Sequence, residues 1–144
     1  MDRRRFVRAL PMLSATAAGM STVSLTACAS VPYLRPVSDG DRVVLRRSDF
    51  GDSLDALVES AHRPWPIYVR RSPDGTFSAV SAYCTHRGCL PDPAGDRLIC
   101  PCHGSEFAFT GELIKGPAED PLRRFEVTSD SDTVTIWLDR RVGS

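Results

Sequence analysis

Two short runs of cysteine and histidine constrain this 144-residue chain more than any other feature. The first run reads Cys84-Thr85-His86-Arg87-Gly88-Cys89, and the second reads Cys100-Pro101-Cys102-His103-Gly104-Ser105. Thiolate and imidazole groups suit metal ions of different softness, and each run supplies both kinds of ligand. A fold that carries these runs is expected to bring them together as two loops around one metal centre.

The runs resemble the two cluster-binding loops of the Rieske iron–sulfur proteins, in which each loop gives one cysteine and one histidine to a 2Fe–2S cluster. The ligands implied by this match are Cys84 and Cys100 for the inner iron, and His86 and His103 for the outer iron. Two thiolates leave the oxidised site neutral, whereas four would leave it negative. Histidine ligation therefore raises the potential at which an electron enters.

The same resemblance assigns roles to residues around the ligands. Cys89 and Cys102 match cysteines that form a disulfide between the loops in high-potential members. Ser105 matches a serine whose hydroxyl donates to a bridging sulfide and stabilises the reduced form. Phe107 stands where quinol-oxidising members usually carry a tyrosine that donates to a ligand cysteine. We therefore expect a potential below the top of the family range of about −150 to +300 mV.

Three further positions refine this picture of the site. Gly104 belongs to the second loop, beside the ligand histidine. Gly116-Pro117-Ala118 resembles the family's proline loop, which covers the cluster from a third side, with Pro117 at its centre. Arg87 replaces a leucine that shields the cluster in quinol-oxidising members. A charged side chain at that position argues against a tip that docks quinol.

The cysteines and histidines allow two other interpretations. Two cysteines and two histidines can bind zinc tetrahedrally, but zinc sequences usually space their ligands as Cys-x₂-Cys and His-x₃₋₅-His, without interleaving. A disulfide-stapled module that has lost its cluster is the other alternative, and the presence of all four candidate ligands speaks against it. His62, the third histidine, is far from both runs, and we expect a surface or packing role for it.

The first 27 residues are expected to be an export signal rather than part of the fold. Arg3 and Arg4 resemble a twin-arginine pair, and the weakly apolar run that follows them argues against a stable membrane span. Leu25-Thr26-Ala27-Cys28 resembles a bacterial lipobox, so Cys28 is a candidate for lipidation. An ordinary signal peptide with an incidental cysteine, or an uncleaved anchor, are the alternatives. The expected location is the periplasmic or extracytoplasmic face, with a lipid anchor in the membrane.

Charge excludes one class of partner. The whole chain carries 18 basic and 18 acidic residues, and four of the arginines lie in the expected signal. The remainder is therefore net acidic and has no basic stripe, which argues against nucleic acid as a partner.

The rest of the sequence predicts an all-β Rieske fold, with an antiparallel base domain, an inserted small cluster-binding subdomain and one short helix. We expect a tether over residues 28–40 and a single domain over residues 41–144, with the subdomain at about 83–117. The helix is expected at 53–60, where Leu54, Leu57 and Val58 have helical spacing. Strands are expected at 42–46, 66–70, 77–82, 97–99, 107–109, 112–114, 125–127 and 133–137.

These features favour an exported, membrane-tethered protein that passes single electrons between redox partners such as a cytochrome or an oxidoreductase. The main alternative is a subunit of a quinol-oxidising cytochrome bc-type complex or of an arsenite-oxidase-like enzyme. No catalytic residue and no small-molecule substrate other than quinol is expected. A ring-hydroxylating oxygenase ferredoxin fits less well, because those proteins are cytoplasmic and usually lack the disulfide cysteines.

Overall fold

The computed structural model describes residues 30–36, 38–61 and 63–141. Within them the chain forms twelve strands and one short 3₁₀ helix, η1. No helix among these residues is long and apolar enough to cross a membrane. The elements, in chain order, are β1 (Tyr33–Leu34), β2 (Ser38–Asp39), β3 (Arg42–Arg46), η1 (Arg47–Phe50), β4 (Asp55–Val58), β5 (Ile67–Arg71), β6 (Phe77–Ser81), β7 (Asp92–Ala94), β8 (Arg97–Ile99), β9 (Glu106–Ala108), β10 (Leu113–Lys115), β11 (Arg124–Ser129) and β12 (Thr133–Arg141).

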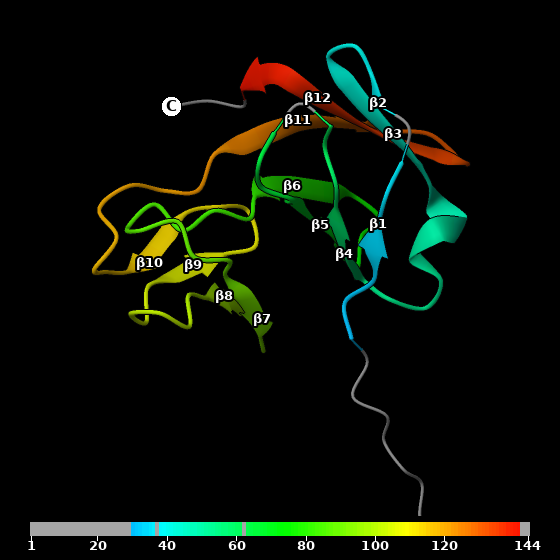
Figure 1. Ribbon diagram of the computed structural model, residues 1–144. Helices are drawn as coiled ribbons and strands as arrows, with labels where there is room; N and C mark the ends of the chain where they lie inside the picture. The colour runs from blue at the N-terminus through cyan, green and yellow to red at the C-terminus, as the bar shows by residue number, and fades with distance from the viewer. Residues whose placement is uncertain (1–29, 37, 62, 142–144) are drawn as a thin grey trace, which may run out of the picture.

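Eight strands form the larger sheet, in the order β1-β4-β5-β6-β11-β12-β3-β2. Its two edge strands, β1 and β2, are separated by only three residues of the chain. Four steps along an extended chain reach at most about 14 Å, so the sheet must curl until its two edges approach each other. Figure 1 shows the result: β2, β3, β11 and β12 lie over β1, β4, β5 and β6.

Apolar side chains fill the space inside the curled sheet. They alternate with exposed ones along β3, where Val43 and Leu45 are buried and their neighbours are exposed, as expected for a strand with one solvated face. The buried residues of this first core are Val43, Leu45, Phe50, Ala56, Val58, Ile67, Val69, Ala79, Phe125, Val134, Ile136 and Leu138.

Four strands form a second, smaller sheet, in the order β10-β9-β8-β7. It lies beside the larger sheet, and a second apolar core fills the space between them (Figure 1). Strand β5 serves both cores, because Ile67 and Val69 point into the first and Tyr68 into the second. The second core consists of Tyr68, Val80, Ala82, Cys84, Leu98, Cys100, Phe107, Ala118 and Leu122.

The helix expected at 53–60 is wrong: residues Asp55–Val58 form strand β4. Ala56 and Val58 are buried and alternate with half-buried neighbours, which is the period of a strand, and β4 pairs with β5 on one side and with β1 on the other. Over so few residues, the apolar spacing of this segment fits both the helical period of about 3.6 and the strand period of about 2. The segment forms a strand because it pairs with another strand on each of its two edges.

The tether expected over residues 28–40 is wrong for four of its residues, which join the sheet as β1 and β2. Strand β1 runs parallel to β4, and the Leu57 amide donates to the Pro32 carbonyl at 2.9 Å. Residues 33, 34, 38 and 39 therefore belong to the larger sheet.

Candidate metal centre

The first cysteine–histidine run forms a tight loop between β6 and β7. The Cys84 amide donates to the Cys89 carbonyl at 2.9 Å, and the Gly88 amide donates to the Cys84 carbonyl at 2.7 Å. Gly88 has a φ of +80°, and a Cβ there would lie 2.5 Å from the ring of Tyr83. Only glycine fits this position, because a side chain would be both strained and in collision with the tyrosine.

The second run repeats this backbone arrangement between β8 and β9. The Cys100 amide donates to the Ser105 carbonyl at 2.8 Å, and the Gly104 amide donates to the Cys100 carbonyl at 2.9 Å. Gly104 has a φ of +77°, close to that of Gly88. Each loop is therefore closed by the same two hydrogen bonds, which fix the first cysteine of each run at the base of its loop.

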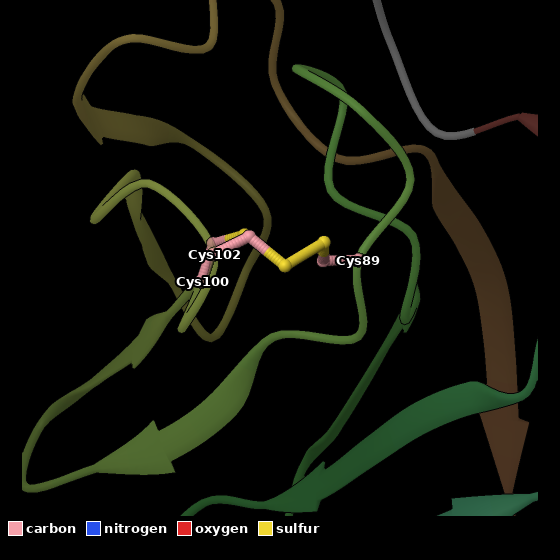
Figure 2. A group of neighbouring side chains, drawn as sticks. All are labelled: Cys89, Cys100 and Cys102. Atoms are coloured by element: carbon pink, nitrogen blue, oxygen red, sulfur yellow. A yellow bond between two sulfur atoms is a disulfide. The ribbon is translucent and has the colours of Figure 1, made fainter.

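A disulfide joins the two loops between Cys89 and Cys102, with an S–S distance of 2.01 Å. This confirms the pairing implied by the sequence resemblance. Figure 2 shows the bond bridging the loops, with Cys100 directly beneath Cys102. The sulfur of Cys100 lies within 4.8 Å of both disulfide sulfurs. These three cysteines do not themselves form a metal site, because two of them are committed to each other.

The other two cysteines of the runs, Cys84 and Cys100, are free thiols, 0% and 1% exposed. Burial, followed by the hydrogen bond with the Cys84 thiol, raises the pKa of Cys100. Burial disfavours the thiolate form of both cysteines, and a bound metal ion, which replaces the thiol protons and releases them to solvent, would stabilise it.

The two histidines of the runs lie against each other at the outer end of the loops. The rings of His86 and His103 have centroids 4.7 Å apart and meet edge to face. The Nδ1 atom of His86 is buried and has no hydrogen-bond partner among the described residues. His103 is exposed. A buried ring nitrogen without a partner is costly, and a metal ion is the partner that would remove the cost.

The expected proline loop reaches both ligand loops. The Ala118 amide donates to the Ser105 Oγ at 3.0 Å, and both residues are buried. The Thr85 hydroxyl donates to the carbonyl of Asp120 at 2.6 Å. Pro117 is exposed and, with Thr85, His86, Glu119 and Asp120, lines a shallow hollow beside the first loop.

Two of these contacts were not found from the sequence. The Thr85 hydroxyl donates a hydrogen bond to a residue 35 positions away, and the Ala118 amide donates one to a residue 13 positions away. No local pattern identifies such pairs, although Thr85 lies between two candidate ligands. The aromatic pair of Trp65 and Tyr83, with ring centroids 4.2 Å apart, was likewise not anticipated.

The structure describes two of the remaining predicted site residues, Phe107 and Arg87. Phe107 is fully buried in the second core, together with Cys84 and Cys100. Arg87 is exposed on the first loop. Cys28, Arg3 and Arg4 lie outside the described residues, as does His62.

The residues of the two loops fit a 2Fe–2S cluster with mixed ligands. Two buried thiols lie at the base of the loops and two imidazoles at their outer end, and one imidazole nitrogen lacks a partner within the part of the chain that the structure describes. Thiolates on one iron and imidazoles on the other are the donor set of a Rieske-type centre. The fold and the site thus define a small all-β iron–sulfur protein.

The comparison with protein families agrees with this class. The model of the Rieske [2Fe-2S] domain matches residues 39–126, which is more than half of the chain. The chain belongs to the Rieske [2Fe-2S] family, and its cofactor is the Rieske 2Fe–2S cluster. It is an iron–sulfur electron-transfer protein, homologous to Rieske subunits of cytochrome b6f.

Curated relatives include cytochrome b6-f complex iron-sulfur subunits. The subunit of Chlorobaculum thiosulfatiphilum is 27% identical over 137 residues, which cover 94% of this chain and 75% of the relative. That of Chlorobaculum tepidum is 41% identical over 66 residues, covering 44% of this chain and 36% of the relative. The match to the second relative thus spans about a third of its length.

Two solved structures resemble the fold. The cyanobacterial plasma membrane Rieske protein PetC3 from Synechocystis PCC 6803 has a TM-score of 0.56 and 29% identity, covering 63% of this chain and 93% of that one. A chain in the complex of reduced oxygenase and oxidized ferredoxin in carbazole 1,9a-dioxygenase has a TM-score of 0.60 and 25% identity, covering 73% of this chain and 100% of that one.

Proposed function

We propose that the protein is a one-electron carrier whose cluster is held by Cys84 and Cys100 on the inner iron and by His86 and His103 on the outer iron. The observation that carries this proposal is the buried Nδ1 of His86, which has no hydrogen-bond partner among the described residues and lies beside the ring of His103, together with the two buried free thiols of the same loops. The bound cluster supplies reversible acceptance and release of one electron.

The burial of the candidate ligands suggests where a partner approaches. The cysteines are enclosed in the second core, whereas His103 is exposed at the outer end of the loops. A redox protein such as a cytochrome or an oxidoreductase comes closest to the cluster at this end. No substrate pocket is required, because only an electron crosses the interface.

Residues around the ligands tune the centre in this proposal. The Ser105 hydroxyl stabilises the reduced form, and the absence of a hydroxyl at Phe107 leaves the potential below the top of the family range. The disulfide between Cys89 and Cys102 holds the two loops at a fixed separation.

The experiment that tests the carrier is a reductive titration of the purified holoprotein, followed by mixing with ferricytochrome c. The proposal expects one electron taken up per chain and its complete transfer to the cytochrome. Uptake of two electrons per chain, or a reduced protein that cannot reduce the cytochrome, would contradict it.

Export and membrane attachment form the second part of the proposal. Arg3 and Arg4 direct folded, cluster-loaded protein through the twin-arginine route, and lipidated Cys28 anchors it to the membrane on the extracytoplasmic face. A relative from Synechocystis is named as a plasma membrane protein, which supports this location.

The location is tested by fractionating cells that produce the native chain or the Cys28→Ser variant. The native chain should sediment with membranes, and Cys28→Ser should lose this association while the cluster remains. Intact membrane association of Cys28→Ser would exclude the lipid anchor, and retention of an Arg3→Lys, Arg4→Lys variant outside the cytoplasm would exclude the twin-arginine route.

A subunit of a quinol-oxidising complex is the second candidate. The curated relatives favour it, because they are named as subunits of cytochrome b6-f complexes. Phe107 and the exposed Arg87 count against it. Purification from native membranes in mild detergent separates the two: a stable complex with a cytochrome b subunit supports this candidate, and a free protein supports the carrier.

A further inference from the structure

One hydrogen bond connects the proline loop to the second ligand loop. The Ala118 amide donates to the Ser105 Oγ at 3.0 Å. Both residues are buried, Ser105 completely and Ala118 to all but 4%. Water therefore does not compete for this bond.

The bond determines how the Ser105 hydroxyl is used. A serine hydroxyl has one proton to donate and two lone pairs to accept with. The Ala118 amide occupies a lone pair, so the proton has to point away from residue 118. Among the described residues, no acceptor takes this proton. A buried donor without an acceptor is costly, which indicates an acceptor supplied by the cofactor.

The position of Ser105 identifies that acceptor. Ser105 closes the second loop, because its carbonyl accepts from the Cys100 amide at 2.8 Å. Ser105 is completely buried and belongs to the loop that carries two of the four candidate ligands, so the acceptor assigned to its proton is a sulfur of the centre rather than water. Donation to a sulfur stabilises the reduced, more negative cluster.

The segment that carries the Ala118 amide is itself anchored to the other loop. The Thr85 hydroxyl donates to the Asp120 carbonyl at 2.6 Å, two residues after Ala118. Further along, the Leu122 amide donates to the Gly111 carbonyl at 2.9 Å. The amide thus comes from a segment held at several points, which is what a fixed orientation of the hydroxyl requires.

We propose that the main-chain amide of Ala118 is a positioning group for the redox centre: it fixes the Ser105 hydroxyl so that its proton is donated to the cluster, and the proline loop thereby sets the potential. The inference rests on the ligand assignment proposed above. It assigns the tuning to a main-chain atom outside both ligand loops.

The test replaces the Ala118 amide by an ester, through incorporation of lactic acid at position 118. This change removes the N–H donor and retains the side chain. The midpoint potential, measured by a redox titration followed by electron paramagnetic resonance, should fall in the ester variant and also in Ser105→Ala. In the doubly changed protein the ester should cause no further fall, because its effect passes through the hydroxyl.

A matched control is an ester at Leu122. It removes one main-chain N–H donor from the same segment, but the lost hydrogen bond is the one to the Gly111 carbonyl and not one to Ser105. Its potential should equal that of the unchanged protein. An ester at 118 that leaves the potential unchanged, or that lowers it equally with and without the Ser105 hydroxyl, would overturn the proposal. A fall of the same size from the Leu122 ester would also overturn it.

If the ester at 118 prevents assembly of the cluster, hydrogen exchange provides the second measurement. The Ala118 amide should exchange faster in the Ser105→Ala holoprotein than in the unchanged holoprotein, and the Leu122 amide should not change. Equal exchange at Ala118 in the two proteins would overturn the proposal. A chain that shows no cluster signal in its unchanged form refutes the ligand assignment instead, so the two failures are distinguishable.

Discussion

Single residues of the second core control both the packing and the chemistry of the centre. Cys84, Cys100 and Phe107 share one apolar cluster, so the two candidate cysteine ligands lie in a region of low polarity. Electrostatic interactions are stronger there than in water, and one added donor changes the energy of the reduced state measurably. At Phe107, which shares this cluster, such a donor can be added as a single hydroxyl group.

Phe107→Tyr should raise the midpoint potential. The added hydroxyl would donate to a ligand sulfur and stabilise the reduced form, at a packing cost of about 1–3 kcal/mol in a site that is fully buried. Phe109→Tyr is a suitable control, because Phe109 is half-buried and stacks on Tyr68 instead. An unchanged or lower potential in Phe107→Tyr would mean that the hydroxyl does not reach the sulfur.

Removal of one candidate ligand should abolish the cluster. We expect Cys84→Ala and His103→Ala to be purified without the visible absorption and the paramagnetic signal of the native protein, because no other described thiol or imidazole adjoins the centre. His62→Ala, the remaining histidine variant, should keep both signals. An intact cluster spectrum in either ligand variant would refute the assignment.

At the scale of the element, short turns hold neighbouring strands of the larger sheet together. The turn between β11 and β12 depends on Asp130, whose carboxylate accepts from the amides of Asp132 and Thr133 and from the Thr133 hydroxyl. These hydrogen bonds lower the pKa of Asp130, and the bond from the Asp132 amide has the largest effect. A carboxyl group with a lowered pKa stabilises the fold while it is ionised.

Asp130→Ala should lower the melting temperature at pH 7. The contribution is fully present above the ordinary pKa of an aspartate, about 3.9, and disappears as the pH falls through the lower pKa of the folded state. The difference between the variant and the native protein should therefore shrink on acidification, as measured by thermal unfolding at several pH values. A difference that stays constant down to the most acidic pH would show that the charge plays no part.

Elements with turn residues at their ends were predictable from the sequence, whereas elements defined by distant pairing were not. Strand β8 has the expected bounds, and the hairpin of β9 and β10 turns at Thr110 and Gly111 as expected. The sequence did not predict strand β7, because all three of its residues are exposed and Pro93 lies within it, so no apolar alternation marks it. Strand β4 was taken for a helix, since its partners β1 and β5 lie outside its own sequence window.

The candidate site was predictable to a greater extent than the fold around it. The motif spacing predicted which loops meet, and the structure confirms the disulfide. The contacts of Thr85 and of the Ala118 amide come from a segment that returns to the loops late in the chain. Such contacts depend on the path of the whole chain, which local patterns do not specify.

At the scale of the whole molecule, a well-packed base supports a small subdomain with little core of its own. The curled eight-stranded sheet encloses the first core, whereas the four-stranded sheet shares the second core with β5 and β6 of the base. Small units bury too little apolar surface to be stable alone. We expect the disulfide and the cluster to supply the stability that the small apolar core of the subdomain does not provide.

Replacement of both disulfide cysteines, Cys89→Ser with Cys102→Ser, should destabilise the subdomain by about 3 kcal/mol, the value for closing a short loop. The bond spans 13 residues and joins the two ligand loops, so the variant should lose its cluster faster than the native protein during mild heating. The visible absorption of the cluster, followed with time, measures this rate. Equal rates would show that the hydrogen bonds of the loops suffice.

The electron paramagnetic resonance spectrum of the purified holoprotein after reduction with ascorbate tests the central claim most directly. A cluster with two imidazole ligands should give a rhombic signal whose average g value lies below that of the free electron, and a mild reductant should be enough to produce it. A protein that contains zinc and shows no signal, or one whose signal has the higher average g value of an all-cysteine cluster, would contradict the account.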